Sequence, residues 1–184
     1  EYNGDKQFVT ASTYKLLVAY SLLKRIDSGA RSWDSDQACF NKMISLSDNA
    51  CAESFLNAIG VSTLTSEANA IGLKNSTFMK GGGPYTTAND QALLLGMIAT
   101  GQNFSSANQQ RLLEAMKKNV YRKGIPAGVS GTIADKVGFM NGLLHDSAIV
   151  YSSHGTYVLS IMTDGASWEA IADLAKQLDA LRAQ

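Results

Sequence analysis

The chain has 184 residues, of which 45% are hydrophobic and 17% are charged, so we expect one globular domain rather than a disordered segment. Sixteen Lys and Arg balance sixteen Asp and Glu, and the sequence holds no basic run, which argues against nucleic-acid binding. The longest apolar run, residues 16–23, is far shorter than the roughly 20 residues that a membrane-spanning helix needs. Two cysteines without a histidine cluster do not make a zinc site, and we expect neither metal nor cofactor.

Apolar spacing predicts helices over most of the chain. Leu16, Leu17, Tyr20, Leu23 and Ile26 recur at helical spacing within residues 13–27, and a glycine follows at position 29. The same pattern predicts helices over residues 35–44, 50–59, 64–71, 89–100 and 106–120. A short polar break at residues 45–49 separates the second helix from the third.

The composition changes after Pro126. Segments 132–140, 147–153 and 156–163 are rich in β-branched residues, and His154-Gly155 between the last two is a hairpin signal. Residues 168–181 then read as an amphipathic closing helix. Helices followed by antiparallel strands predict a single α+β domain.

Ser12-Thr13-Tyr14-Lys15 lies where the chain enters the first helix. Residues three apart share a helix face, so the Lys15 amine is expected beside the Ser12 hydroxyl. A desolvated lysine can be neutral enough to take a proton from serine, and the N–H groups at a helix start can stabilise an oxyanion. Taken alone, this spacing arises by chance, and Ser12 could simply cap the helix.

Two further short motifs carry polar side chains at fixed places. Ser47-Asp48-Asn49 lies in the break between two predicted helices, where Asp48 or Asn49 would also serve as a helix cap. Lys136-Val137-Gly138 lies on the first predicted strand, where a glycine lets a ligand backbone approach closely. Neither motif is informative by itself.

Together and in this order, the three motifs form the set found in class A β-lactamases and penicillin-binding proteins, the serine D-Ala-D-Ala peptidases. The chain resembles that superfamily beyond the motifs. Segments 8–15 (FVTASTYK), 43–52 (MISLSDNACA), 86–101 (TTANDQALLLGMIATG) and 124–138 (GIPAGVSGTIADKVG) are all similar to family segments. The resemblance covers nearly the whole chain and implies a β-lactamase/transpeptidase-like fold, with an active site between a helical lobe and an antiparallel sheet. Within one domain over 1–184, the helical lobe would cover about 30–115 and the sheet lobe about 1–29 and 116–184.

The resemblance assigns the chemistry to three side chains. Ser12 would be the acylated nucleophile, Lys15 the base that activates it, and Ser47 the relay that protonates the leaving nitrogen. These roles agree with what the residue types can do.

Substrate binding would fall to other residues. Asn49 would hold the amide side chain of the substrate. Lys136 would attract the carboxylate of the substrate and keep Lys15 deprotonated. Gly138 would admit the substrate to the strand. The oxyanion hole would consist of the backbone N–H groups of Ser12 and Phe139.

The chain departs from class A β-lactamases where they carry a glutamate that activates the hydrolytic water. Residues 68–89 contain no Asp or Glu, and the loop at 74–85 (KNSTFMKGGGPY) is short and glycine-rich. We therefore expect slow hydrolysis of the acyl-enzyme. Glu53 is the nearest acidic residue that could replace the missing glutamate as a base. We favour the alternative that Glu53 is an ordinary exposed or cleft-lining residue of its helix. His145 and His154 read as structural or solvent-facing.

Carboxylate recognition is also weakened. Val137 replaces the hydroxyl residue usual in the third motif, and residues 133–163 contain no arginine. A substrate carboxylate would then depend chiefly on Lys136, while Arg122 either reaches the site or has a structural role. Ser12 and Ser47 are only 35 residues apart, so we expect an open cleft.

Eleven residues precede Ser12, fewer than the family's N-terminal strands need. We expect these strands to be missing or truncated, leaving an unpaired edge on the strand at 156–163. Cys39 and Cys51 flank Ser47 and form either a disulfide or two buried thiols. A disulfide would fit an extracytoplasmic protein whose signal segment is not in this chain.

We therefore predict a serine hydrolase or acyltransferase that forms an acyl-serine with D-alanyl cell-wall peptides or β-lactams. Slow deacylation would make it similar to penicillin-binding proteins, and we expect a monomer that needs no cofactor. A true class A β-lactamase is the main alternative. A non-catalytic module that binds peptidoglycan or a partner protein, and an esterase, stay open as well.

Overall fold

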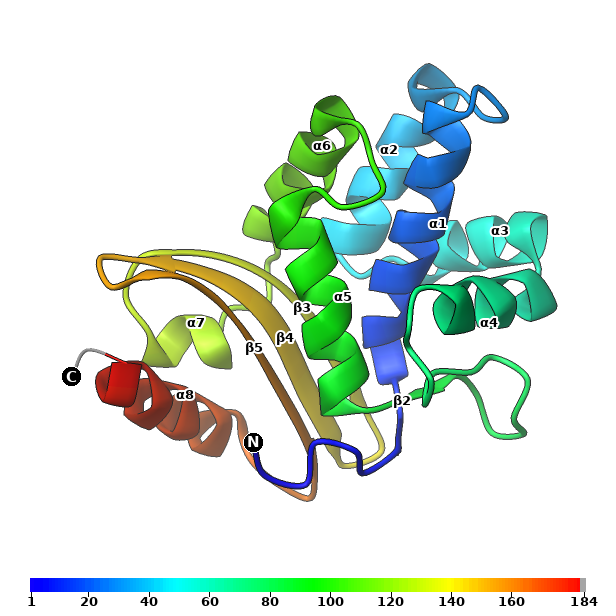
Figure 1. The fold of residues 1–184 in the computed structure, drawn as a ribbon. Helices are drawn as coiled ribbons and strands as arrows, with labels where there is room; N and C mark the ends of the chain where they lie inside the picture. The colour runs from blue at the N-terminus through cyan, green and yellow to red at the C-terminus, as the bar shows by residue number, and fades with distance from the viewer. Residues whose placement is uncertain (183–184) are drawn as a thin grey trace.

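The computed structural model describes residues 1–182 and has the predicted α+β fold, with helices on one side of an antiparallel sheet and two more helices on the other (Figure 1). A 3₁₀ turn, η1 (Ala11–Tyr14), leads into the helices of the first side. These are α1 (Lys15–Asp27), α2 (Trp33–Ser45), α3 (Asn49–Ile59), α4 (Val61–Ala70), α5 (Ala88–Thr100) and α6 (Ser106–Lys117).

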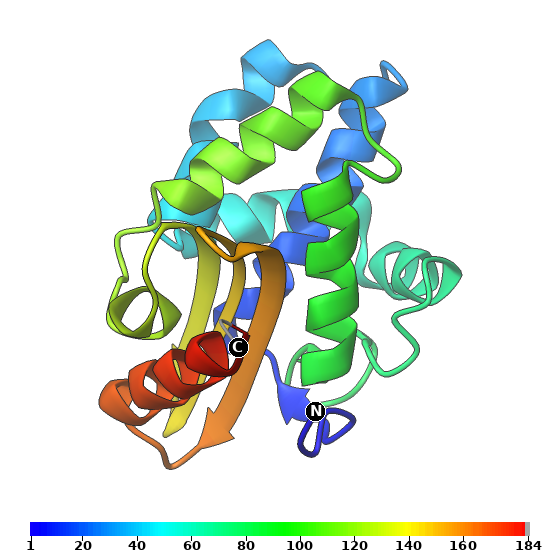
Figure 2. The same ribbon diagram turned by 60° about the vertical axis from the view of Figure 1, so that its left-hand side comes forward.

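The sheet has the order β3-β4-β5, with β3 (Thr132–Met140), β4 (Leu143–Ser152) and β5 (Gly155–Asp164) all antiparallel. Helices α7 (Ile125–Gly128) and α8 (Trp168–Arg182) cover its outer face (Figure 2). The core on this face is formed by strand residues that alternate along β3, β4 and β5 and by helix residues that pack on them. The strand residues are Ile133, Ala148, Val150 and Ile161, and the helix residues are Ile125, Ile171 and Ala175.

Helix α1 is the centre of the helical lobe. Every residue from Lys15 to Leu23 is buried, and α1 packs against α2, α3, α4 and α6. Its apolar side chains share one core with those helices and with the inner face of the sheet. Since α1 contacts both the helices and the sheet, the expected lobe boundary at residues 29–30 stays a prediction.

The predicted helices and strands are confirmed, with shifted ends. Helix α6 ends at Lys117, three residues earlier than predicted, and β4 begins at Leu143, four residues earlier. His154 is exposed in the β4–β5 turn, as predicted. Within residues 1–182, β5 pairs only with β4, and the short strand β1 (Phe8–Val9) pairs instead with β2 (Tyr85–Thr86).

His145 is buried at the junction of these two sheets. Its Nε2 lies 2.9 Å from the Val9 carbonyl oxygen, and its Nδ1 accepts a hydrogen bond from the Thr163 N–H at 3.2 Å. Burial lowers the pKa of His145. It therefore has the structural role that the sequence predicted.

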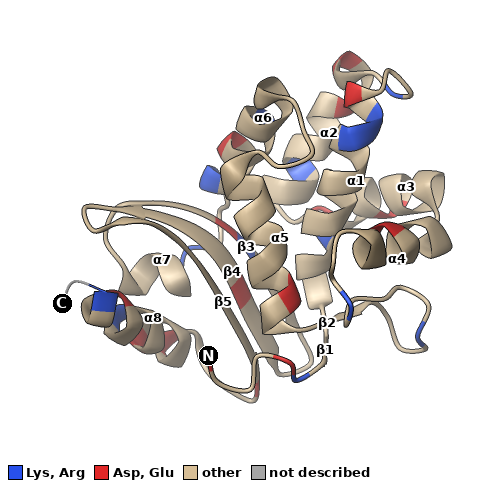
Figure 3. Cartoon of the chain, in the orientation of Figure 1, with Lys and Arg blue, Asp and Glu red and all other residues tan. Residues whose placement is uncertain are grey.

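Acidic and basic residues are interspersed over both lobes (Figure 3). Among residues 1–182, every helix is too short or too polar to span a bilayer. No cluster of three or more potential metal ligands occurs in the same residues.

Candidate active site

Ser12 and Lys15 meet at the start of the helical lobe. Ser12 lies in η1 and Lys15 is the first residue of α1. Side chains three residues apart nearly eclipse in a 3₁₀ turn, and the Lys15 Nζ lies 3.2 Å from the Ser12 Oγ. Lys15 is completely buried, whereas Ser12 is partly exposed. The serine can therefore be reached by a substrate while the amine behind it is shielded from water.

The turn between α2 and α3 places Ser47 and Asn49 against the same amine. Ser47 has a φ of 60°, and Asp48 caps α3 by accepting a hydrogen bond from the Cys51 N–H at 2.8 Å. The Lys15 Nζ donates to the Ser47 carbonyl oxygen and to the Asn49 Oδ1, both at 2.6 Å. It also lies 3.4 Å from the Ser47 Oγ.

Lys136 approaches from the sheet side. It is completely buried on β3, and its Nζ lies 2.9 Å from both the Ser47 Oγ and the Val137 carbonyl oxygen. The hydroxyl of Ser47 therefore lies between two lysine amines from different lobes. Three motifs that are separated by up to 124 positions in the sequence form one continuous hydrogen-bonded group.

Burial makes both amines unusually acidic. It lowers the pKa of Lys15 to about 8, although the carboxylates of Asp48 and Glu53 act in the opposite direction. It also lowers the pKa of Lys136 to about 7, with a further contribution from the charge on Lys15 and an opposing one from Asp135 and Asp146. A neutral amine is therefore available beside Ser12 near neutral pH.

Gly138 brings β3 into close contact with η1. A Cβ on this residue would lie 2.8 Å from the Ser12 backbone nitrogen and 2.7 Å from the Thr10 carbonyl oxygen, closer than any side chain could be accommodated without a backbone shift. Phe139, whose N–H the sequence predicts in the oxyanion hole, is the residue that directly follows this contact on β3.

Arg122 has a structural role instead of reaching the site. Its guanidinium pairs with the buried carboxylate of Asp135, which also accepts a hydrogen bond from Asn119, and it donates to the Ile133 carbonyl oxygen at 3.3 Å. Burial raises the pKa of Asp135 and of its neighbour Asp146. The Arg122 guanidinium therefore neutralises the Asp135 carboxylate and is not available to a substrate.

Cys39 on α2 and Cys51 on α3 form a disulfide, with their Cα atoms 5.2 Å apart. This cross-link joins the two helices that enclose the Ser47 turn. It restrains the corner that carries Ser47 and Asn49.

Acidic side chains near the site are engaged elsewhere. Asp90 accepts hydrogen bonds from the Asn75 N–H at 2.9 Å and from the Ser76 hydroxyl at 2.7 Å, so it holds the 74–85 loop. Glu53 is exposed on α3. Among residues 1–182, no carboxylate forms a hydrogen bond with Ser12, Lys15 or Ser47.

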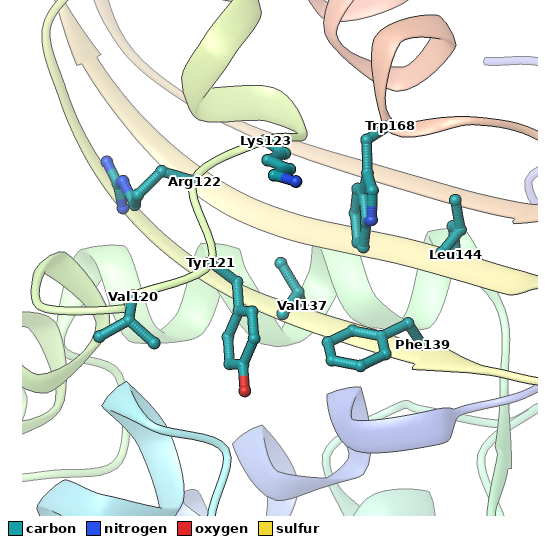
Figure 4. A pocket seen from close by; sticks show the side chains of 8 residues that line it. All are labelled: Val120, Tyr121, Arg122, Lys123, Val137, Phe139, Leu144 and Trp168. Carbon is teal, nitrogen blue, oxygen red and sulfur yellow. The ribbon is translucent and has the colours of Figure 1, made fainter.

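A cavity of about 220 Å³ on the outer side of β3 was not predicted from the sequence (Figure 4). Its lining residues come from the α6–α7 connection, β3, β4 and the start of α8. Because these segments are distant in sequence, only the sheet register brings them together. The alternation of apolar residues along β3 and β4 was a partial signal for this cavity.

A family model and solved structures match this chain. The family model described as the beta-lactamase enzyme family matches residues 35–181. A search of curated proteins finds no match.

Solved structures of similar fold include a beta-lactamase from Sphaerobacter thermophilus DSM 20745, with a TM-score of 0.91 and 18% identity over 99% of this chain and 86% of that one. A mutant of PBP-A, solved as an acyl-enzyme complex with penicillin G, has a TM-score of 0.91 and 22% identity over 100% and 85% of the two chains. An ancestral class A beta-lactamase has a TM-score of 0.87 and 22% identity over 98% and 88%. At these identities, the matched structures establish the fold.

Proposed function

This chain belongs to the beta-lactamase enzyme family, and from that premise we propose that it is an acyl-serine enzyme whose nucleophile is Ser12. The observation that carries the proposal is the 3.2 Å approach of the Ser12 Oγ to the completely buried amine of Lys15. An amine with a pKa near 8 can remove the proton of a serine hydroxyl at neutral pH. The substrates that we propose are β-lactams and D-alanyl cell-wall peptides.

The hydrogen bonds of Lys15 favour its role as the base. A neutral lysine amine has two N–H groups and one lone pair, and the Ser47 carbonyl oxygen and the Asn49 Oδ1 at 2.6 Å take the two N–H groups. The lone pair is then left for the hydroxyl of Ser12. The surrounding acceptors therefore orient the amine as a proton acceptor.

The acylation step follows from this arrangement. The Ser12 Oγ attacks the carbonyl carbon of the substrate while its proton passes to Lys15, and the N–H groups of Ser12 and Phe139 stabilise the oxyanion. The C–N bond then breaks, and Ser47 donates its proton to the leaving nitrogen. Lys15, 3.4 Å from the Ser47 Oγ, returns a proton to that oxygen, so the amine ends the step neutral.

Substrate binding falls to the polar groups around the nucleophile. We propose that Asn49 holds the amide side chain of the acyl group and that Lys136 attracts negative charge on the leaving-group side. Because residues 1–182 place no carboxylate in contact with Ser12, we further propose that the acyl-enzyme is long-lived. This behaviour is typical of a penicillin-binding protein. The disulfide supports an extracytoplasmic location.

Incubation with a fluorescent penicillin, followed by intact and peptide mass measurement, tests the proposal. We expect one lasting adduct on Ser12 that is absent in Ser12→Ala and strongly reduced in Lys15→Met. Rapid turnover of a chromogenic cephalosporin without a lasting adduct would instead indicate a true β-lactamase. Absence of any adduct in the folded wild-type protein would contradict the proposal and favour a non-catalytic binding module.

A further inference from the structure

The cavity on the outer side of β3 has predominantly apolar walls. They are formed by Val120, Tyr121, Val137, Phe139, Leu144 and Trp168 (Figure 4). Val137 and Phe139 project from the face of β3 opposite to Lys136, since side chains alternate along a strand. On β4, Leu144 lies directly across from Phe139.

Two walls of this cavity belong to segments that also contact the proposed active site. Val137 follows Lys136, whose amine contacts the Val137 carbonyl oxygen at 2.9 Å. On the opposite wall, the Val120 N–H donates to the carbonyl oxygen of Ser45 at 3.0 Å, two residues before Ser47. Both contacts are made by segments next to Lys136 and Ser47, so we infer that the cavity serves the leaving-group side of the site rather than the side where Asn49 would hold the acyl group.

The aromatic side chains at its mouth stay exposed among the described residues 1–182. Phe139 is 45% exposed and Tyr121 37% exposed. They pack edge to face with ring centroids 5.3 Å apart, and Phe139 makes a similar contact with Trp168 at 6.2 Å. A contiguous exposed apolar surface in a cleft is typical of a ligand-binding site.

The charges in the cavity do not favour a carboxylate. Arg122 lines the cavity, but its guanidinium is paired with Asp135. Lys123, the other cationic residue among the described lining residues, is exposed at the rim. A carboxylate that entered between Val137 and Leu144 would lose its hydrating water without gaining an ion pair, which costs free energy. An apolar group would gain from the same transfer.

We propose that this cavity binds an apolar, ring-sized substituent on the leaving group of the acyl donor. Its volume of about 220 Å³ exceeds the roughly 150 Å³ of an apolar cavity that holds benzene. The proposal rests on the proposed function, because it needs Ser12 to be acylated. It adds that, with the same acyl part, an aromatic or branched aliphatic leaving group reacts faster than a small carboxylate-bearing one. D-alanyl peptides and penicillin then remain substrates, because Lys136, on the other face of β3, and not the cavity attracts their carboxylate.

Two thioesters with the same phenylacetylglycyl acyl part test this preference. One has benzyl mercaptan as its leaving group and the other has mercaptoacetate, which carries a carboxylate. In both, the bond from the Ser12 Oγ to the carbonyl carbon forms, the carbon–sulfur bond breaks, and the serine proton ends on the departing sulfur. The measured quantity is the second-order rate constant for acylation of Ser12, followed by mass measurement. We expect the benzyl thioester to react about ten to one hundred times faster.

Three variants locate the preference in the cavity. Tyr121→Ser removes part of the wall and should reduce the preference for the benzyl thioester several-fold. Leu144→Arg places a cation in the cavity and should raise the rate with the carboxylate-bearing thioester. Leu93→Ser removes a comparably exposed apolar side chain from α5 (43% exposed) and should leave the preference unchanged.

The outcomes separate the two proposals. If a fluorescent penicillin labels Ser12 but the carboxylate-bearing thioester reacts as fast as the benzyl thioester, the cavity assignment is wrong and the acyl-serine function stands. The same conclusion follows if Tyr121→Ser, once shown to be folded, keeps the full preference. If neither thioester nor penicillin acylates the folded protein, the proposed function is wrong and the cavity assignment falls with it.

Discussion

Replacing Asn49 by aspartate would test whether Lys15 is the base. The Asn49 Oδ1 lies 2.6 Å from the Lys15 Nζ, and Asn49→Asp keeps the size of the side chain while placing a carboxylate beside the amine. An opposite charge at this distance favours the protonated amine and raises its pKa by roughly one to three units. The substitution should therefore lower the fraction of Lys15 that is neutral while the amine stays in place.

The size of the effect follows from the pKa of Lys15. A pKa of about 8 leaves about one amine in ten neutral at pH 7, whereas the ordinary value of 10.5 would leave about one in 3,000. A rise of one to two units in Asn49→Asp should thus slow acylation about 10- to 100-fold at pH 7. Because the amine is still present, most of this loss should be recovered near pH 10.

The assay is the second-order rate constant for labelling by a fluorescent penicillin between pH 6 and pH 10. For the wild type, we expect a rise of about tenfold per pH unit that levels off near pH 8. Asn49→Asp should level off at a higher pH. Glu53→Gln is a matched test of the opposite sign, because Glu53 is exposed and now raises the pKa of Lys15. Its removal should shift the profile slightly to lower pH.

One result would refute the reasoning. If all three proteins level off at the same pH, and Asn49→Asp is slower by the same factor throughout, then Asn49 acts only on the substrate. In that case Lys15 is not the group whose ionisation controls acylation.

Further predictions concern the structural support of the site. Gly138→Ala should lower the free energy of unfolding by about 1–3 kcal/mol and strongly slow acylation, because its Cβ would meet the backbone of η1. Gly96→Ala, where a Cβ meets nothing within 4 Å, should instead be neutral or stabilising in the same urea titration. Replacing Cys39 and Cys51 together by serine removes a cross-link between residues 12 positions apart and should cost about 3 kcal/mol by loop entropy, with labelling retained at 25 °C; an unchanged urea midpoint would contradict this. Arg122→Met leaves a buried carboxylate without its cation and should cost about 2 kcal/mol, with a loss that shrinks in acid as that carboxylate is protonated.

Regular elements and the site motifs could be predicted from local patterns. The apolar spacing from Leu16 to Ile26 marks α1, and β-branched residues on either side of His154 mark the β4–β5 hairpin. The order of the three motifs predicted which polar groups would meet. Each element and each motif is contained within a short run of consecutive residues, which is why it could be recognised without the fold, whereas the roles of the motif residues came from the resemblance to a known family.

Long-range packing could not be predicted in the same way. The pairing of Arg122 with Asp135 depends on the chain turning back at α7. The sequence was therefore equally consistent with an Arg122 that reaches the site and with one that has a structural role. The outer cavity joins Tyr121 to Trp168 across 47 positions. The two-residue strands β1 and β2 are too short to produce a period-two pattern.

The lifetime of the acyl-enzyme depends on whether Lys15 can act a second time. Once Ser47 has protonated the leaving group and regained its proton, Lys15 is again neutral, but its lone pair faces an ester oxygen in place of a hydroxyl. Asp90 is held by Ser76 and the Asn75 N–H, whereas the amine lies 3.2 Å from the Ser12 Oγ and could activate water there. If it does so, deacylation should level off near pH 8, as acylation does. A release rate that keeps rising tenfold per unit to pH 10 would instead identify hydroxide as the nucleophile and exclude a second role for Lys15.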